Sequence, residues 1–334
     1  LEDGSMESLN YENQYYEPVN DPLSPILSGN ENIFDPNRWQ PLTLSVFIDQ
    51  SGQVTGENTP PFLGAEWGNV HPFGLNEGDL SIFSRDDNPY NVYHDPGPPP
   101  FLNNSDEENF DFVNAFSMVP IWGSHLSSEN DISWDISPRS IGNFNLNNFP
   151  TSVSDYTNFY NYYSGGDVST GHELNPFTNL PYNPQFVLRG DYTRVLAEFW
   201  ADGPESETPP GHWFVLLNKV SDDPLLIKKF KGEGDILSNL EWDIKSYFIL
   251  GGTMHDTAVS VWGIKGWYDY VRPISIIRYL SALGQSSDSS LANYHPQGFP
   301  IIEGHIETVE EGDFLVGENN ENLGKIKLYT WKGH

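Results

Sequence analysis

The chain has no cysteine, few basic residues and no long apolar run. Without cysteine among its 334 residues, disulfides and thiolate metal sites are excluded. Only 16 Lys and Arg stand against 47 Asp and Glu, which gives a net charge of −31. Such a charge repels nucleic acid and anionic membranes, so nucleic acid is not an expected partner. No apolar run approaches the roughly 20 residues that cross a bilayer, so no membrane span is predicted.

What the chain does have is a high content of aromatic residues and acidic loops. Aromatic residues make up 14% of the sequence, which predicts a core rich in rings. The acid-rich loops, of which residues 104–109 are an example, could take Ca²⁺, although no EF-hand spacing is present. No charged segment followed by an apolar one, typical of a signal peptide, begins at Leu1.

The character of the sequence changes near residue 186. Residues 1–185 are crowded with Asn, Pro and Gly, which predicts a long, irregular, loop-rich region that docks on a core through its aromatic residues, with one or two short hairpins. Residues 186–334 read as a helical part. Short connections favour a mainly α fold, a helical bundle. We expect helices over 110–126, 191–202, 207–222, 240–250, 253–272 and 273–285, with Asp191 and Thr253 as caps.

Two cations in the stretch Met254–Pro273 draw attention. Lys265 and Arg272 are seven residues apart, close to two turns of one helix, which would place both on one face roughly 10 Å apart. Trp262 lies one turn before Lys265. An ammonium and a guanidinium on one face suit a tetrahedral oxyanion. The alternative interpretation is an ordinary solvated stripe of an amphipathic helix.

The same stretch carries a family resemblance. Lys265, six intervening residues and then Arg272-Pro273 match the first signature of the vanadium-dependent haloperoxidases and type 2 phosphatidic acid phosphatases (PAP2). Trp262, Met254 and Asp256 fit the same helix, and residues 60–75, 189–213 and 240–248 resemble a large bacterial branch of that superfamily. The resemblance implies a helical bundle of the vanadium chloroperoxidase or PAP2 type.

It also implies a site. Lys265 and Arg272 would bind the oxygens of vanadate, the expected cofactor, and Trp262 would line the halide pocket. His255 and Asp256 would support the site, either as an acid–base pair or with Asp256 orienting a basic side chain. Fixed cations of this kind offset the charge on vanadate or on a transferring phosphoryl group.

The departures from the family pattern concern the second half of the site. In the family, a Ser-Gly-His follows the Arg-Pro, and an Arg is followed six residues later by the vanadium-ligating His. Here the triplets that end in Gly-His are Thr170-Gly171-His172, Glu303-Gly304-His305 and Lys332-Gly333-His334, and no Arg has a His six residues later. We therefore expect the vanadium-ligating His outside this chain, as in an internal piece of a longer protein; a separate chain or a degenerate homologue are the alternatives.

The expected function is oxidation of halide with hydrogen peroxide at bound vanadate. The alternatives are a PAP2-type acid phosphatase that uses a phosphohistidine intermediate and hydrolyses small phosphoesters, and a non-catalytic homologue that serves as a binding or structural module. The resemblance and the acidity predict a secreted or periplasmic bacterial protein. The remainder of the protein is an expected partner, without which this piece would expose an apolar face, and a homo-oligomer is left open.

Overall fold

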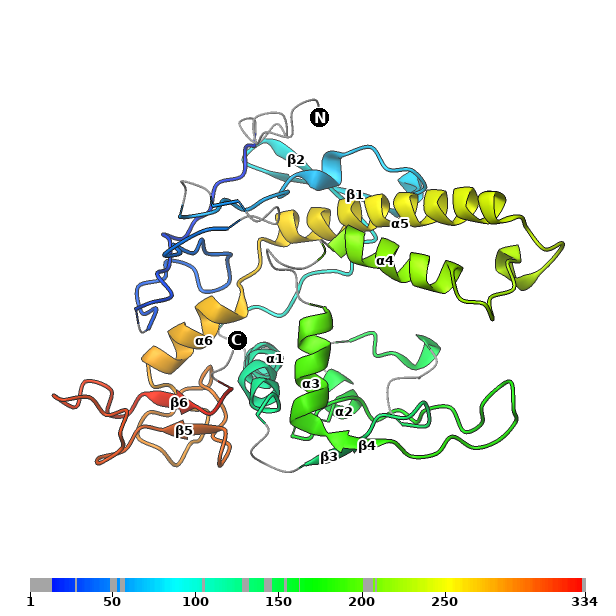
Figure 1. Cartoon of the computed structure of the whole chain (residues 1–334). Coiled ribbons are helices and arrows are strands. Elements are labelled where there is room, and N and C mark those ends of the chain that lie inside the picture. Colours follow the sequence, from blue (N-terminus) through cyan, green and yellow to red (C-terminus); the bar gives the residue numbers. More distant parts are fainter. Residues whose placement is uncertain are drawn as a thin grey trace. The chain divides into compact units, whose positions relative to one another are not determined.

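The chain folds into two compact units, each assembled from separate segments (Figure 1). The computed structural model describes residues 14–27, 29–48, 53–54, 58–103, 106–127, 132–140, 146–152, 155–161, 163–200, 207 and 209–331. Unit 1 comprises the described parts of Leu1–Pro25, Arg38–Pro99 and Ala201–Tyr270. Unit 2 comprises those of Ile26–Asn37, Pro100–Trp200 and Val271–His334.

Unit 1 is built on α5, a helix of 30 residues over Asn239–Tyr268. Its N-cap is Ser238, whose side chain accepts a hydrogen bond from the Glu241 amide, as expected of serine at this position. The prediction of two helices, the second capped by Thr253, is wrong: one helix runs through the Gly251-Gly252 pair. Each glycine costs a helix only about 1 kcal/mol relative to alanine, and packing along a long helix offsets that cost.

The C-terminal half of α5 packs against a hairpin and a short turn of helix. Strands β1 (Leu80–Arg85) and β2 (Asn88–Tyr93) pair antiparallel, and η3 (Trp67–Asn69) lies against the same helix. The two residues between the strands, Asp86 and Asp87, have φ of 52° and 65°. Positive φ at both positions is the signature of a type I′ turn, which suits the twist of a two-residue hairpin. The remaining short element here is η4 (Glu77–Asp79).

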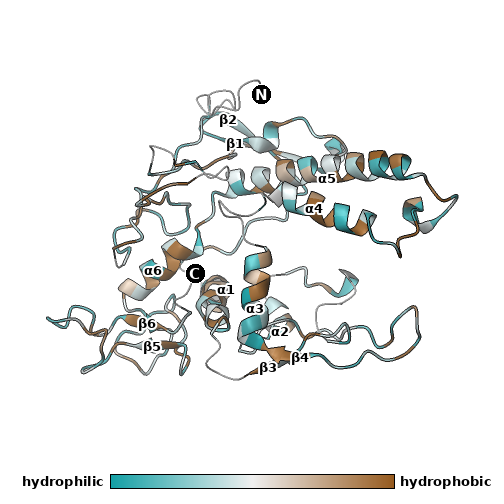
Figure 2. Ribbon diagram, viewed as in Figure 1, coloured by the Kyte–Doolittle hydropathy of each residue, from teal (hydrophilic) through white to brown (hydrophobic). Residues whose placement is uncertain are grey.

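The N-terminal half of α5 runs beside α4 (Pro209–Ser221), so the predicted helix over 207–222 is confirmed (Figure 1). Trp242 Nε1 donates a hydrogen bond of 3.1 Å to Ser221 Oγ, and the Phe214 and Tyr247 rings stack at 5.6 Å. Both helices carry hydrophobic and hydrophilic residues along their length (Figure 2). The short helix η7 (Phe230–Gly232) lies in the connection between them.

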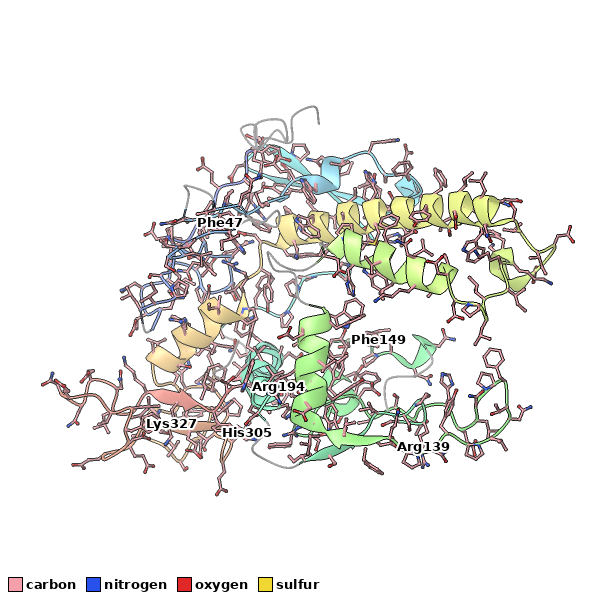
Figure 3. The ribbon with its side chains drawn as sticks, viewed as in Figure 1. Phe47, Arg139, Phe149, Arg194, His305 and Lys327 are labelled. Carbon is pink, nitrogen blue, oxygen red and sulfur yellow. The ribbon has the colours of Figure 1, made fainter. Side chains whose placement is uncertain are left out.

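Unit 2 contains the remaining helices and two further small sheets. Strand β3 (Ser133–Asp135) pairs with β4 (Phe186–Leu188), and β5 (Ile306–Thr308) pairs with β6 (Ile326–Leu328), both antiparallel. Ion pairs of Lys327 on β6 with Asp313 at 2.6 Å and Glu307 at 3.3 Å brace the second sheet; Lys327 is labelled in Figure 3. The helices are α1 (Asp106–Ser124), α2 (Tyr156–Phe159), α3 (Arg189–Phe199) and α6 (Pro273–Ala282), with η5 over Leu146–Asn148.

The core of unit 2 is formed by the fully buried side chains of α1, α6 and the segment that follows α6. These include Phe112, Ile121, Ile276, Leu280, Phe299 and Ile306. The helices predicted over 110–126, 191–202 and 273–285 correspond to α1, α3 and α6. Asp191 does not cap α3; the cap position is Leu188, and Asp191 lies within the first turn.

The predicted mainly α helical bundle is wrong. Of the described residues, 33% are helical and 13% are strand, and they hold three separate two-stranded antiparallel sheets. The physical reason lies in what covers the helices: a hairpin and the loop around residues 64–69 pack on α5 where a bundle would place another helix. Within the described residues, no helix is long and apolar enough to cross a membrane. The division predicted at residue 186 stays a prediction.

Candidate oxyanion site

Lys265 lies on the last turns of α5, above an indole ring. Its Nζ is 4.5 Å from the centroid of the Trp262 ring, one turn earlier on the helix. Trp262 in turn stacks on Trp67 with the ring centroids 5.3 Å apart, and its Nε1 donates a hydrogen bond of 2.9 Å to the Leu63 carbonyl. A cation held over tryptophan gains about 0.5–2 kcal/mol, which restricts where the ammonium can go. The lysine is therefore positioned by a ring that is itself fixed.

The Lys265 ammonium has no acidic partner in the part of the chain that the structure describes. The side chain is exposed, and its contact is with the Trp262 ring. Lys245, on the same helix, shows the usual alternative: its Nζ lies 2.6 Å from the Glu241 carboxylate one turn away. In a chain of net charge −31, a lysine that faces solvent without a carboxylate is available to an incoming anion.

The position of the Trp262 ring depends on a glycine at residue 64. Gly64 has φ +74°, a left-handed conformation that residues other than glycine rarely adopt. A Cβ at this position would also overlap the Trp262 ring. Trp67 covers part of the same ring. Trp262 is thus a packed aromatic that supports Lys265, and its predicted place in a halide pocket stays a prediction.

Asp256 fastens a loop to α5. Its Oδ1 and Oδ2 accept hydrogen bonds of 2.7 Å each from the amides of Phe73 and Gly74. Burial acts to raise the pKa of Asp256, but these bonds to the charged form outweigh it and hold the pKa below its usual value. His255 Nδ1 lies 3.2 Å from Asp256 Oδ1, and its ring meets the Phe73 ring edge-on.

The geometry limits what Asp256 can orient. Along a helix, nine residues rise about 13 Å, so Asp256 lies about that far from Lys265 along the axis. The basic side chain beside Asp256 is His255 instead. The supporting role predicted for His255 and Asp256 at the site stays a prediction; the contacts observed hold the loop around residue 73 on α5.

Arg272 does not share the helix of Lys265. Helix α5 ends at Tyr268, with Asp269 in the left-handed region at φ 48°, and Arg272 is the N-cap of α6 with extended backbone. The helix predicted over 253–272 therefore stops four residues early, and the single-face arrangement of the two cations is wrong. Pro273 is the first reason, because the residue before a proline is pushed out of the helical region.

The second reason that α5 ends at Tyr268 is a set of hydrogen bonds that caps the end of the helix. The Arg38 guanidinium donates to the Tyr268 carbonyl at 3.1 Å, and Arg85 donates to the Gly266 and Trp267 carbonyls. Cations beside the last carbonyls of a helix satisfy those groups and favour the negative end of its dipole. The half-buried Arg272 belongs to unit 2, and its predicted role as an oxyanion ligand stays a prediction.

Two of the three Gly-His triplets considered in place of Ser-Gly-His lie among the described residues: Thr170-Gly171-His172 in an irregular segment and Glu303-Gly304-His305 in a turn. His172 donates its amide to the Pro138 carbonyl at 2.8 Å, and Gly171 is packed against the same backbone. The Gly304 amide donates to Glu307 at 2.8 Å, and Glu303 keeps a carboxylate where the family has a hydroxyl. Lys332-Gly333-His334 lies outside the described residues.

A buried histidine and arginine were missed by sequence reasoning. His125, at the end of α1, is 2% exposed, and its Nε2 donates to the Tyr163 carbonyl at 2.8 Å. Burial first and the charge of Arg189 second lower the pKa of His125 to about 4. Arg189, the first residue of α3, is 6% exposed, and burial lowers its pKa too. No short motif marks either residue; only tertiary packing brings the two side chains together.

A contact of unit 2 brings a second histidine to the end of α1. Ser124 Oγ lies 3.4 Å from His305 Nδ1 (His305 is labelled in Figure 3).

Among the described residues, no cluster of three or more His, Asp or Glu side chains is arranged to hold a metal ion. The predicted Ca²⁺ site stays a prediction, and of the loop over 104–109, residues from Asp106 onward belong to α1.

Comparison of the chain with protein-family models, curated proteins and solved structures returns no match. The resemblance to the vanadium-dependent haloperoxidases therefore stays a prediction. What the structure contributes is one well-defined local arrangement, Lys265 over Trp262 at the end of α5.

Proposed function

We propose that this protein works as a vanadium-dependent haloperoxidase-like protein in which Lys265 binds an oxygen of vanadate. The observation that carries the proposal is the exposed Lys265 ammonium, fixed 4.5 Å above Trp262 and without an acidic partner among the described residues. A positioned cation of this kind contributes to oxyanion binding because little conformational freedom is lost when the anion arrives.

The residue types fit an oxyanion in part. The Lys265 ammonium suits one oxygen of the anion, and the contribution expected of Arg272 stays a prediction. The Ser-Gly-His and the vanadium-ligating His of the family have no counterpart in this sequence, and we propose that residues outside it supply them. When bound, vanadate activates hydrogen peroxide for attack by halide. A secreted or periplasmic location is part of the same proposal.

The proposal is tested by titrating the intact protein with orthovanadate. Halogenation of a dye in the presence of bromide and peroxide is followed at each concentration. Lys265→Ala is expected to weaken vanadate binding about 10- to 100-fold, the range for losing a charge-assisted hydrogen bond. The matched control is Lys245→Ala, because Lys245 is exposed on the same helix but paired with Glu241. It should leave binding unchanged.

Two other outcomes point elsewhere. Phosphatase activity that vanadate inhibits, without halogenation, would move the protein to the phosphohydrolase alternative, which uses the same ligands. Equal vanadate binding by the Lys265→Ala and Lys245→Ala variants would reject Lys265 as a ligand and leave it as a solvated lysine.

A further inference from the structure

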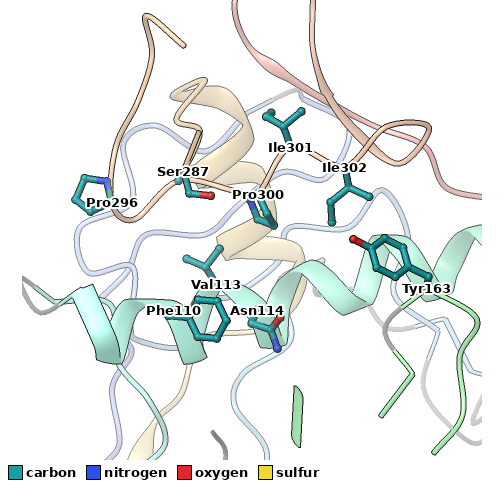
Figure 4. Close-up of a pocket in the computed structure, with 10 residues that line it drawn as sticks. Phe110, Val113, Asn114, Tyr163, Ser287, Pro296, Pro300, Ile301 and Ile302 are labelled. Carbon is teal, nitrogen blue, oxygen red and sulfur yellow. The ribbon is translucent and has the colours of Figure 1, made fainter. Parts of the chain in front are cut away.

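Unit 2 contains a cavity of about 390 Å³ between α1 and the segment that follows α6 (Figure 4). Its floor is apolar and buried, formed by Val113 of α1 and by Gly298 and Ile302 of the later segment. The exposed rings of Phe110 and Tyr163 stand at its rim. The volume falls within the range of sites for small molecules, roughly 300–1,000 Å³.

The wall of the cavity is fixed by backbone contacts. The Ser287 amide donates to the Phe299 carbonyl at 2.9 Å, and the Phe299 amide donates to the Gln285 carbonyl at 3.1 Å. A Cβ on Gly298 would come within 2.5 Å of the Ser286 backbone, so only glycine allows the two segments to lie this close. The protein's own backbone contacts therefore hold the wall of the cavity in place, which lowers the entropic cost of binding.

A hydrogen bond to its backbone fixes Tyr163 at the rim of the cavity. The Tyr163 carbonyl accepts the hydrogen bond of the buried His125, which holds the backbone of Tyr163 while its ring extends to the cavity (Figure 4). On the opposite side, Phe110 projects from the first turns of α1. Two aromatic rings over an apolar floor favour a flat ligand, because ring pairs add about 0.5–1.5 kcal/mol beyond the area they bury.

The lining also restricts the charge of the ligand. No Lys, Arg, His, Asp or Glu is among the described residues that line the cavity. An ion placed there would lose its hydration without gaining a partner. The polar groups are the Asn114 amide and the hydroxyls of Ser287 and Tyr163, which suit a single hydroxyl or N–H on the ligand.

We propose that this cavity binds a neutral aromatic molecule of one or two rings that carries one hydrogen-bonding group. The floor takes the ring, the two rim aromatics flank it, and Asn114 or Ser287 meets its polar edge. This inference stands independently of the oxyanion proposal, because every residue it uses belongs to unit 2 and none is involved in vanadate binding.

The experiment uses 2-naphthol as the neutral probe and 2-naphthalenesulfonate as its anionic counterpart, with the full chain, by calorimetric titration. We expect 2-naphthol to bind with a dissociation constant on the order of 0.1 mM and the sulfonate to bind at least tenfold more weakly. Ser287→Trp, which places a large ring in the opening, should weaken 2-naphthol binding at least tenfold. Ser290→Trp, three residues further along and outside the lining, is the matched control.

A second variant separates binding from folding. Phe110 is 61% exposed, so Phe110→Ala should fold normally, as circular dichroism will check, while it weakens 2-naphthol binding about two- to tenfold. Three results would each overturn the proposal: no binding of 2-naphthol to the unmodified protein, equal binding by the Ser287→Trp and Ser290→Trp variants, or equal affinity for the neutral and the anionic probe.

Discussion

Gly266 faces Ala65 so closely that a Cβ at residue 266 would overlap the Ala65 carbonyl oxygen. One turn earlier, a Cβ on Gly263 would come within 2.7 Å of the Asn91 carbonyl oxygen and 3.1 Å of the Gly68 Cα. The C-terminal half of α5 therefore packs backbone against backbone on a loop and a strand of unit 1. This close approach places the Trp262 and Lys265 turn beside Trp67.

Gly266→Ala is expected to lower the free energy of unfolding by about 1–3 kcal/mol, because the backbone of residue 65 must move to admit the methyl group. The control is Gly251→Ala on the same helix, where a Cβ would meet only the Phe214 ring edge at 3.9 Å. There the helix preference of alanine should raise stability by up to about 1 kcal/mol. Urea denaturation followed by circular dichroism measures the free energy of unfolding of both variants. A change of the same sign in both would contradict the close packing of Gly266 on Ala65.

Asp256→Asn is expected to lower stability by about 1–2 kcal/mol, because the amide nitrogen cannot accept the second of the two bonds from Phe73 and Gly74. Hydrogen exchange of those two amides should quicken. Asp243→Asn is the control, since Asp243 lies on α5 and its carboxylate makes no hydrogen bond or ion pair within the described residues. Unchanged exchange at residues 73 and 74 would show that the loop is held by other contacts.

The same carboxylate predicts a pH effect. Its pKa in the folded protein lies below the ordinary value, so its stabilising contribution is present above about pH 4, the pKa of the unfolded chain. That contribution is lost as the pH falls through the folded pKa. Unfolding measured between pH 3 and pH 6 should therefore show a steeper acid dependence in the unmodified protein than in the Asp256→Asn variant.

Trp262→Phe is expected to lower the stability of the fold and to weaken the cation–π contact with Lys265. The substitution removes the Nε1 donor to the Leu63 carbonyl, at a cost of about 1–2 kcal/mol, and presents a weaker ring to the ammonium. A double-mutant cycle with Lys265→Ala, read as vanadate affinity or as stability, should give a coupling energy of about 0.5–1 kcal/mol. A coupling near zero would show that the ring does not position the lysine.

His125 should remain neutral down to about pH 4. Its pKa is lowered to about 4, whereas an unfolded histidine titrates near 6.5. Between these values the unfolded chain binds more protons, so the folded state loses stability as the pH falls, by a total of about 3 kcal/mol. Histidine NMR titration gives the pKa directly. His125→Gln keeps a donor for the Tyr163 carbonyl but cannot titrate, and it should lose this part of the acid dependence.

Several elements were predictable because they rest on local physics. The apolar periodicity of α1, α3, α4 and α6 marked those helices to within a few residues, and the Pro and Gly content of the first hundred residues indicated loops. The break before Pro273 was also local, since proline restricts its predecessor whatever surrounds it. Lys265 beside Trp262 followed from one turn of helical spacing, and the structure places the ammonium over the ring.

The sequence by itself determined the charge of the surface, the positions of most helices and the pairing of Lys265 with Trp262, because each depends on composition or on neighbours within one turn. Only the tertiary structure decided that α5 runs unbroken through Gly251-Gly252 and stops at Tyr268. It also decided that Asp256 serves a loop, and that His125 and Arg189 are buried together. These features depend on residues far apart in the chain, such as Arg38 and Arg85 at the end of α5, whose meeting no local pattern encodes.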